Sequence, residues 1–165
     1  MNPKTILVVD DEFYTAEILS SVLEDEGFRV LTAVNGRDGL DKLKLSPIDL
    51  VILDIMMPIM NGAEMARTMR GDPVLANVPV LITSALSEAV AQEMVQRYQG
   101  FLRKPFQIQS VLAQVRTILQ DADGQMARVG RPGNIRQEPR EHGSGRRLAE
   151  DENARSPEAN QGERG

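Results

Sequence analysis

Acidic side chains follow two short apolar runs of the sequence, where they could act together. The triplet Asp10-Asp11-Glu12 comes directly after the run ILVV, and Asp54 comes directly after the run LVIL. Carboxylates brought close together repel one another, so such a cluster normally raises a pKa or recruits a hard cation. Mg²⁺ fits best, because it is typically held by one or two carboxylates plus a phosphate oxygen. The missing ligand is therefore a phosphoryl group.

Asp54 is the candidate nucleophile for that chemistry, since carboxylates form aspartyl-phosphate intermediates. Ser84 and Lys104 stand at the ends of two further apolar runs. The ammonium of Lys104, together with the metal, can neutralise oxygens of the transferring group, and the hydroxyl of Ser84 can donate a hydrogen bond to it. Each residue alone is weak evidence, whereas all of them at strand ends are difficult to attribute to chance.

The elements that must position these residues alternate along the chain. Five segments rich in branched apolar residues predict buried strands, at residues 5–9, 28–33, 50–53, 80–84 and 100–103. The stretches between and after them have helical spacing, most clearly from Ile108 to Leu119. This alternation predicts an α/β fold with a doubly wound, five-stranded parallel sheet and helices on both faces.

The order of the strands decides whether the acids meet. In open parallel sheets, ligands bind outside the carboxyl ends of the strands, where the strand order reverses. If the order is 2-1-3-4-5, the first and third strands are neighbours about 4.8 Å apart. We then expect Asp11 and Asp54 to share one pocket, with Ser84 and Lys104 at the same edge of the sheet.

The apolar periodicity stops near Leu119, which predicts a folded domain over residues 1–122 and a disordered tail over residues 123–165. Residues 125–165 contain few large apolar side chains, too few to offset the entropy of ordering the segment. These residues contain eight arginines and seven acids, which gives them a net charge of +1. Because the whole chain has a net charge of −5, the folded part has a net charge of −6. The tail is either a solvated linker or a basic docking segment, and its interspersed Glu favours the linker.

Composition excludes several classes of function. Cysteine is absent, which removes disulfides, thiolate metal sites and cysteine nucleophiles. No apolar run approaches the roughly 18 to 20 residues of a membrane helix, and the start reaches acids too soon for a secretory signal. The net charge of −5 argues against a general nucleic-acid surface. We expect a cytoplasmic protein that binds neither membranes nor nucleic acid.

Over about residues 4–120 the sequence resembles a response-regulator receiver domain, the phosphorylated switch of two-component signalling. The resemblance rests on four motifs in order: VVDDE at 8–12, DIMMPIMNG at 54–62, the strand end Ser84-Ala85, and FLRKPF at 101–106. It implies the flavodoxin-like sheet with the order 2-1-3-4-5. It also implies that Asp54 is the phosphoacceptor, that Asp11 binds Mg²⁺ directly and Asp10 through water, and that the backbone carbonyl of Met56 completes the protein ligands.

The resemblance assigns the remaining motif positions as well. Ser84 takes the place of the hydroxyl residue that turns toward the phosphoryl group, and Lys104 that of the lysine that bridges to it. Phe101 occupies the switch aromatic position, although a core aromatic would need no switch. The peptide between Lys104 and Pro105 would be cis. The usual Gly-Ala before the last strand is replaced by RYQG at 97–100, so the connection that precedes Phe101 departs from the family pattern.

The implied function is that of a phospho-accepting switch and not of an enzyme. A histidine kinase or phosphotransfer protein would donate the phosphoryl group and dock on the first helix near Ala16, Leu19 and Ser20. The output face would be formed by the fourth helix, the fifth strand and the fifth helix. Met56 and Leu86 stand where the family tunes hydrolysis, and neither side chain can orient a water by hydrogen bonding. We therefore expect the phosphorylated state to persist for minutes or longer, with at most slow self-dephosphorylation.

Two alternatives belong to other classes. A Mg²⁺-dependent phosphohydrolase of the haloacid dehalogenase type also uses an aspartyl phosphate, but its nucleophile should end the first strand in an Asp-x-Asp motif, which this chain lacks. A pseudo-receiver would keep the fold without the phosphorylation. The presence of Asp11, Asp54, Ser84 and Lys104 argues against that alternative.

Overall fold

The computed structural model describes residues 2–129, and most of the expected tail, residues 130–165, lies outside the described residues. Strands and helices alternate along the described chain, as the apolar pattern predicts. The ten elements are β1 (Thr5–Val9), α1 (Phe13–Asp25), β2 (Arg29–Ala33), α2 (Gly36–Leu45), β3 (Leu50–Asp54), α3 (Gly62–Gly71), β4 (Val80–Ser84), α4 (Glu88–Met94), β5 (Gly100–Arg103) and α5 (Ile108–Val129).

The five strands form one parallel sheet in the order β2-β1-β3-β4-β5. The predicted fold class and strand order are therefore confirmed. In the central ladder Val9 pairs with Leu53, and Asp54 pairs with Thr83. The ends of β1 and β3 thus lie side by side, at the point where the strand order reverses.

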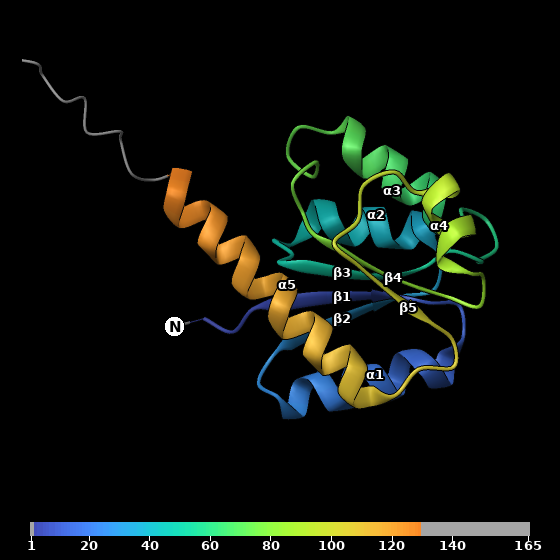
Figure 1. The fold of residues 1–165 in the computed structure, drawn as a ribbon, viewed down its shortest axis with the longest axis horizontal. Coiled ribbons are helices and arrows are strands. Elements are labelled where there is room, and N and C mark those ends of the chain that lie inside the picture. The colour runs from blue at the N-terminus through green and yellow to red at the C-terminus, as the bar shows by residue number, and fades with distance from the viewer. Residues whose placement is uncertain (1, 130–165) are drawn as a thin grey trace, which may run out of the picture. The chain divides into compact units, whose positions relative to one another are not determined.

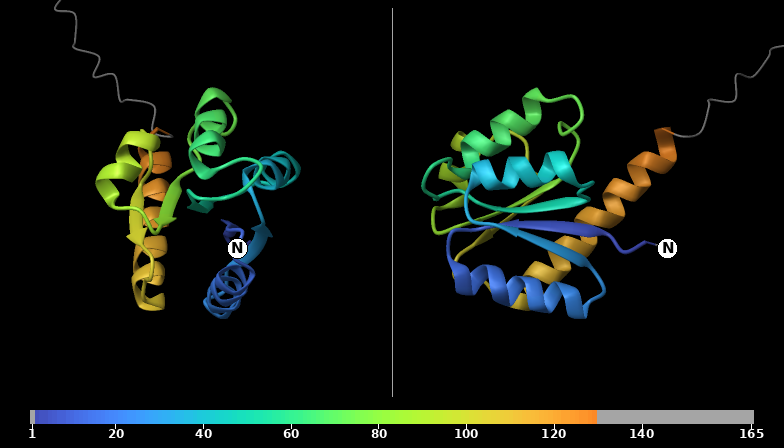
Figure 2. Two further views of the ribbon diagram at one scale, coloured as in Figure 1. Left: turned by 90° about the vertical axis from the view of Figure 1, so that its right-hand side faces the viewer. Right: turned by 180° about the vertical axis from the view of Figure 1, so that it is seen from behind.

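Helices cover both faces of the sheet (Figure 1). One face packs against α1 and α5, and the other against α2, α3 and α4, as the two rotated views also show (Figure 2). Three strands, β1, β3 and β4, are buried along their whole length. Strands buried on both faces read as continuous apolar runs, which is why these strands are visible in the sequence.

Local capping fixes where two of the helices begin beside the candidate site. The side chain of Asn35 accepts a hydrogen bond of 2.9 Å from the backbone N–H of Asp38 at the start of α2. At the start of α3, Asn61 and Glu64 form a reciprocal capping box, with both hydrogen bonds at 2.9 Å. Each cap satisfies backbone donors that the first turn of a helix leaves unpaired.

The last helix, α5, continues to Val129, which corrects the expectation that regular structure ends at residue 122. Figures 1 and 2 show its final turns projecting beyond the sheet. Once a helix is nucleated on a packed face, each added residue costs little, so the helix outlasts its apolar periodicity. Asp123 also forms a 2.6 Å ion pair with Lys4. Within the described residues, 123–129 are therefore helical.

Arg70, near the end of α3, holds the connection between α4 and β5. Its guanidinium donates to the carbonyl of Arg97 at 2.9 Å, and also to the carbonyls of Ala76 and Val78 at 2.8 and 2.9 Å. The segment 97–100, which departs from the family pattern, is thus joined through Arg70 to the loop between α3 and β4. No helix within residues 2–129 combines the length and apolarity needed to cross a bilayer.

Candidate functional site

An open hollow of about 400 Å³ lies at the carboxyl edge of the sheet, between the ends of β1, β3 and β5. Asp11, Asp54, Met56 and Lys104 line it, together with Glu12 and Ala85. Carboxylate oxygens of Asp10, Asp11 and Asp54 lie within 4.8 Å of one another. These are hard oxygen donors at a spacing that a single divalent cation can bridge, so the residues fit a Mg²⁺ ion.

Asp10 lies behind the hollow, with only 2% of its surface exposed. Its backbone N–H donates to the carbonyl of Ala33 at 3.0 Å, which continues the pairing with the end of β2. One carboxylate oxygen accepts the backbone N–H of Glu12 at 2.9 Å, and the other accepts the ammonium of Lys104 at 2.7 Å. These contacts fix Asp10 in place and stabilise its charge away from water.

Asp54 is 5% exposed at the floor of the hollow. Burial raises the pKa of its carboxyl group, and the charge of Asp10 raises it further, while the charge of Lys104 and a hydrogen bond from the Met56 N–H act in the opposite direction. The Met56 N–H lies 3.4 Å from the Asp54 oxygen that accepts it. A carboxylate destabilised in this way gains from a bound cation.

Lys104 reaches the hollow from the end of β5. Its Nζ lies 2.7 Å from Asp10 and 3.5 Å from Asp54. Burial lowers its pKa, but the hydrogen bond and charge of Asp10, together with the charge of Asp54, outweigh that effect and raise the pKa above its usual value. The side chain is therefore a fixed positive charge beside the candidate nucleophile.

Ser84 stands at the same edge but does not line the hollow. The residue is fully buried, and its Oγ accepts a hydrogen bond of 3.1 Å from the backbone N–H of Leu86. Its backbone carbonyl accepts the N–H of Lys104 at 2.8 Å, which joins the ends of β4 and β5. In this arrangement the hydroxyl oxygen accepts a hydrogen bond from the loop after β4.

The remaining residues of the predicted site lie close to this edge. The side chain of Met56 is 57% exposed beside the hollow. Phe101 is half-buried and packs against the core cluster under α2, α3 and α4, paired with Ile82 across the sheet. The peptide bond between Lys104 and Pro105 is cis.

The loop from Asp54 to α3 is held closely against the sheet by Gly62. Its N–H donates to the carbonyl of Ile55 at 2.9 Å. A Cβ atom at this position would lie 2.2 Å from the backbone oxygen of Asp54. Only glycine permits this approach, so the residue sets the backbone position of the candidate acceptor.

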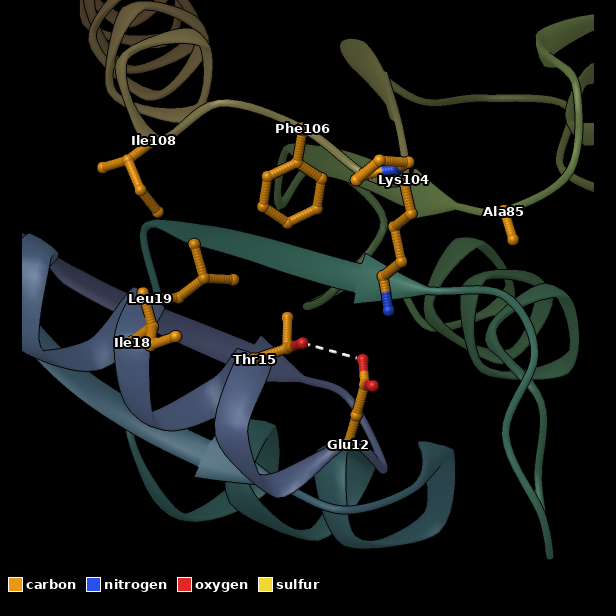
Figure 3. Close-up of a pocket in the computed structure, with 9 residues that line it drawn as sticks. Glu12, Thr15, Ile18, Leu19, Ala85, Lys104, Phe106 and Ile108 are labelled. Atoms are coloured by element: carbon orange, nitrogen blue, oxygen red, sulfur yellow. Dashed lines mark hydrogen bonds between the residues drawn. The ribbon is translucent and has the colours of Figure 1, made fainter.

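A second pocket, of about 590 Å³, opens beside the hollow between α1 and the loop from β5 to α5 (Figure 3). Figure 3 shows Ile18 and Leu19 on one side, facing Phe106 and Ile108 on the other. Glu12 and Lys104 line both cavities, so the apolar pocket adjoins the acidic one. No pattern in the sequence predicted this pocket, although Phe106 lies in the motif FLRKPF.

Two of the residues expected near the docking site on α1 have little accessible surface. Ala16 and Leu19 are 8% and 2% exposed, because they pack into the core under α1 and α5. The neighbouring Ile18 is 53% exposed. The helical spacing of apolar residues identified the buried side of α1, and the accessible surface lies one residue away from it.

Comparison with known proteins agrees with the fold. The sequence model of the response regulator receiver domain matches residues 6–116. The chain is 37% identical over 116 residues to the response regulator ArlR of Staphylococcus aureus, an alignment that covers 69% of this chain and 52% of ArlR. It thus spans about half the length of the curated relatives that it matches. The chain belongs to the response regulator receiver domain family, which serves in two-component systems.

Solved structures agree with this assignment. The chemotaxis protein CheY4 of Vibrio cholerae has a TM-score of 0.67 and 27% identity, over 70% of this chain and 98% of CheY4. The response regulator protein TrrA of Thermotoga maritima, solved in complex with Mg²⁺-BeF, has a TM-score of 0.64 and 32% identity, again over 70% of this chain and 98% of TrrA.

Proposed function

We propose that Asp54 of this chain accepts a phosphoryl group from a phosphohistidine of a sensor histidine kinase or phosphotransfer protein. The observation that carries the proposal is the convergence of Asp10, Asp11 and Asp54 within 4.8 Å, with Lys104 beside them. We place the reaction in the cytoplasm, which the absence of cysteine suits.

Asp54 would be the nucleophile. One of its carboxylate oxygens forms a bond to phosphorus while the P–N bond of the phosphohistidine breaks. The electron pair of the broken bond goes to the ring nitrogen, and the donor leaves as neutral imidazole when its other nitrogen carries a proton. The product on this chain is an acyl phosphate, whose added charge faces the ammonium of Lys104.

Mg²⁺ is the proposed cofactor, and TrrA, a structural neighbour, was solved with this ion. Asp11, Asp54 and the backbone carbonyl of Met56 would hold it, and Asp10 would contribute through water. A bound Mg²⁺ would neutralise negative charge on the transferring group. The exposed position of Asp11 leaves room for the waters that this ion retains.

The protein donor would cover the apolar pocket between α1 and the loop from β5 to α5. Ile18, Phe106 and Ile108 offer apolar contact there, and the pocket shares Lys104 with the acceptor hollow. A donor seated on this surface can therefore reach Asp54. On α1 the exposed Ile18 replaces the buried Ala16 and Leu19 as the proposed contact.

The signal would leave by a change in protein contacts. We propose that the Ser84 hydroxyl exchanges its contact with the Leu86 N–H for one with the phosphoryl group, which shifts the loop before α4. Phe101 packs on the core under α4, so its rotamer can follow that shift. The face formed by α4, β5 and α5 would then present a different surface to a target protein.

Incubation with acetyl phosphate and Mg²⁺ tests this function. We expect intact-protein mass spectrometry to show one added phosphoryl group, lost in Asp54→Ala and kept in Asp41→Asn, which changes an exposed acid on α2. Steady release of phosphate would indicate a phosphohydrolase instead, and no labelling at all would indicate a pseudo-receiver. Either result would contradict the proposal.

Thermal unfolding with and without Mg²⁺ tests the cation site separately. A ligand at 100 times its dissociation constant stabilises a protein by about 2.7 kcal/mol, so saturating Mg²⁺ should raise the melting temperature. Asp11→Asn should reduce this shift, and Asp41→Asn should retain it. Equal shifts in all three proteins would show that the ion does not bind at this cluster.

A further inference from the structure

Three arginines line a cavity on the face of the sheet that α3 and α4 cover (Figure 1). The cavity has a volume of about 370 Å³ and lies between the two helices, beside the connection from α4 to β5. Arg67 and Arg70 belong to α3, and Arg97 belongs to the connection. The residues that line this cavity and those that line the acceptor hollow do not overlap, so the two sites are separate.

The positive charge at this cavity is not balanced by nearby acids. The ion pairs within residues 2–129 include none of the three arginines. Among the described residues that line the cavity, Glu93 is the only acid, so three positive charges and one negative charge give the lining a net charge of +2. This excess stands out in a chain whose net charge is −5.

Arg70 holds part of this charge away from water. Its guanidinium donates to the carbonyls of Ala76, Val78 and Arg97, which are dipoles without net charge. Burial, and then the charge of Arg97, lower the pKa of Arg70, so the two guanidinium groups repel one another. Arginine stays protonated in proteins, and an anion bound beside the pair would relieve this repulsion.

The other two guanidinium groups are available to bind such an anion. The arginine side chains that donate hydrogen bonds within residues 2–129 are those of Arg70 and Arg116. The exposed Arg67 and Arg97 therefore keep all their N–H donors. A guanidinium donates two parallel hydrogen bonds to phosphate, and a phosphate monoester carries about −1.5 to −2 charges at pH 7. Such an ester matches both the donors and the net charge of the cavity.

The rest of the cavity offers an apolar surface to the body of a ligand. Ala63 and Ala66 on α3 and Val95 after α4 are almost fully buried, and Met94 is half-buried. The small alanine side chains leave room above the core. None of the described residues that line the cavity is aromatic, so a nucleobase would find no ring on which to stack. The lining therefore favours an aliphatic ester over a nucleotide.

We propose that the cavity between α3 and α4 binds a small aliphatic phosphate ester, about the size of a sugar phosphate, through the guanidinium groups of Arg67 and Arg97. Arg70 adds its charge to the site while it keeps its hydrogen bonds to the loop carbonyls. The volume lies within the range of about 300 to 1,000 Å³ that is usual for small-molecule sites. The site does not depend on phosphorylation of Asp54, so its test leaves the proposed function untouched.

A nuclear magnetic resonance titration of the full, ¹⁵N-labelled chain tests the proposal. The buffer contains a chelator, so that no metal holds the anions at the aspartate cluster. The probes are glucose 6-phosphate and glycerol 3-phosphate. We expect saturable shifts of the backbone N–H signals of residues 63–67 and 93–97, with a dissociation constant of about 1 mM or lower at low salt.

Three further probes define the ligand class. Glucose should cause no shift, because it lacks the anion. Inorganic phosphate should bind more weakly than the esters, because it leaves the apolar surface uncovered. AMP should bind no more tightly than glucose 6-phosphate, because its base has no stacking partner. Equal binding of glucose or of inorganic phosphate would overturn the assignment, as would tighter binding of AMP.

Arg67→Gln and Arg97→Gln should each raise the dissociation constant about tenfold, because each removes one charged pair of donors. Both positions are exposed, so the melting temperatures should stay unchanged. Arg29→Gln is the matched control. It makes the same change of charge at an exposed residue of β2, the edge strand farthest from β4 and β5 in the sheet, and should alter the constant less than twofold.

Several results would overturn the proposal. One is the absence of saturable shifts with both sugar esters, and another is shifts that centre on Asp11 and Asp54. Equal weakening in Arg29→Gln would show a general effect of charge without a site. Phosphatidic acid also carries a phosphate monoester, so vesicles that contain it test a lipid source. Binding to these vesicles without binding to the soluble esters would contradict a small-molecule site.

Discussion

Lys104 and Asp10 form a 2.7 Å ion pair that joins the ends of β5 and β1 across the candidate site. The Asp10 side chain is 2% exposed and that of Lys104 is 19% exposed, so the pair is largely shielded from water. Lys104 lies farther from Asp54, at 3.5 Å. The lysine thus stabilises a buried structural charge as well as the candidate acceptor.

Replacement of Lys104 by Met should destabilise the domain, because it leaves the Asp10 carboxylate buried without its partner. We expect a loss of roughly 2 kcal/mol in a chelating buffer, below the full cost of breaking a deeply buried pair because Lys104 is partly exposed. Urea unfolding measures the change. The control is Arg116→Met, which removes the exposed pair with Glu26 and should cost less than about 1 kcal/mol. Equal losses would contradict the role of Lys104.

The pH dependence of stability should report the buried charge of Asp54. Burial, and then the charge of Asp10, raise its pKa in the folded state above the value in the unfolded chain. A raised carboxyl pKa means that the folded state binds the proton more tightly, so this contribution to stability is fully present below the unfolded pKa. It is lost as the pH rises through the folded pKa.

Without Mg²⁺, Asp54→Asn should therefore be more stable than the unchanged chain at pH 7. The difference should shrink toward pH 4, where Asp54 is increasingly protonated. Urea unfolding of both proteins across this range, in a chelating buffer, measures the difference and cancels the titration of groups that they share. A variant less stable at pH 7, or a difference independent of pH, would show that Asp54 is not destabilised by its surroundings.

Gly62→Ala should distort the acceptor. The added methyl group would lie 2.2 Å from the backbone oxygen of Asp54, which can move only with the strand. We expect a loss of about 2 to 3 kcal/mol in unfolding free energy and slower labelling by acetyl phosphate. Gly71→Ala is the control, because its Cβ would meet nothing within 4 Å, and it should be neutral or slightly stabilising. A Gly62→Ala variant that matched this control would refute the close approach.

Arg70 should contribute to the stability of the domain through its hydrogen bonds. Burial, and then the charge of Arg97, lower the pKa of its guanidinium, but the carbonyls of Ala76, Val78 and Arg97 accept its hydrogens. Arg70→Met would leave these carbonyls unpaired, at a cost of roughly 2 kcal/mol. Arg67→Met, an exposed position on the same helix, should change the unfolding free energy by about 0.5 kcal/mol or less. Similar effects in both variants would contradict the anchoring role.

The sequence predicted the sheet well because its central strands are buried on both faces. The predicted boundaries of β1, β4 and β5 agree with the structure. The prediction ended β3 at Leu53, whereas the strand includes Asp54, whose backbone pairs with Thr83. A hydropathy pattern depends on the side chains, whereas the pairing of strands is made by the backbone. A polar residue at the end of a strand is therefore easily assigned to the following loop.

Contacts between elements could not be predicted from the sequence. The position of Ser84 could be predicted from its strand, but the direction of its hydroxyl depends on the Leu86 N–H, which belongs to the following loop. The continuation of α5 beyond residue 122 depends on helix propagation and on the contact of Asp123 with Lys4. Ile59 has a left-handed backbone, with a φ of 70°. This conformation follows from the hydrogen bonds of Met60 and Gly62, and a β-branched residue type argues against it.

The lifetime of the phosphorylated state should be long, because the residues beside the acceptor cannot position a water molecule. Met56 is 57% exposed at the hollow, and Leu86 is half-buried against the core. Neither side chain has a hydrogen-bonding group that could orient a water for attack on phosphorus. We expect radiolabelled phosphoprotein, freed from its donor, to lose its label over minutes or longer.

Met56→Asn places an amide beside the acceptor and should shorten that lifetime by roughly tenfold, since a positioned hydrogen-bonding group assists water attack. Met126→Asn is the control, because Met126 is 77% exposed on the projecting end of α5, away from the hollow. Its lifetime should equal that of the unchanged chain. Loss of label within seconds from the unchanged chain would contradict the prediction, because it would require a water-orienting group that neither Met56 nor Leu86 supplies.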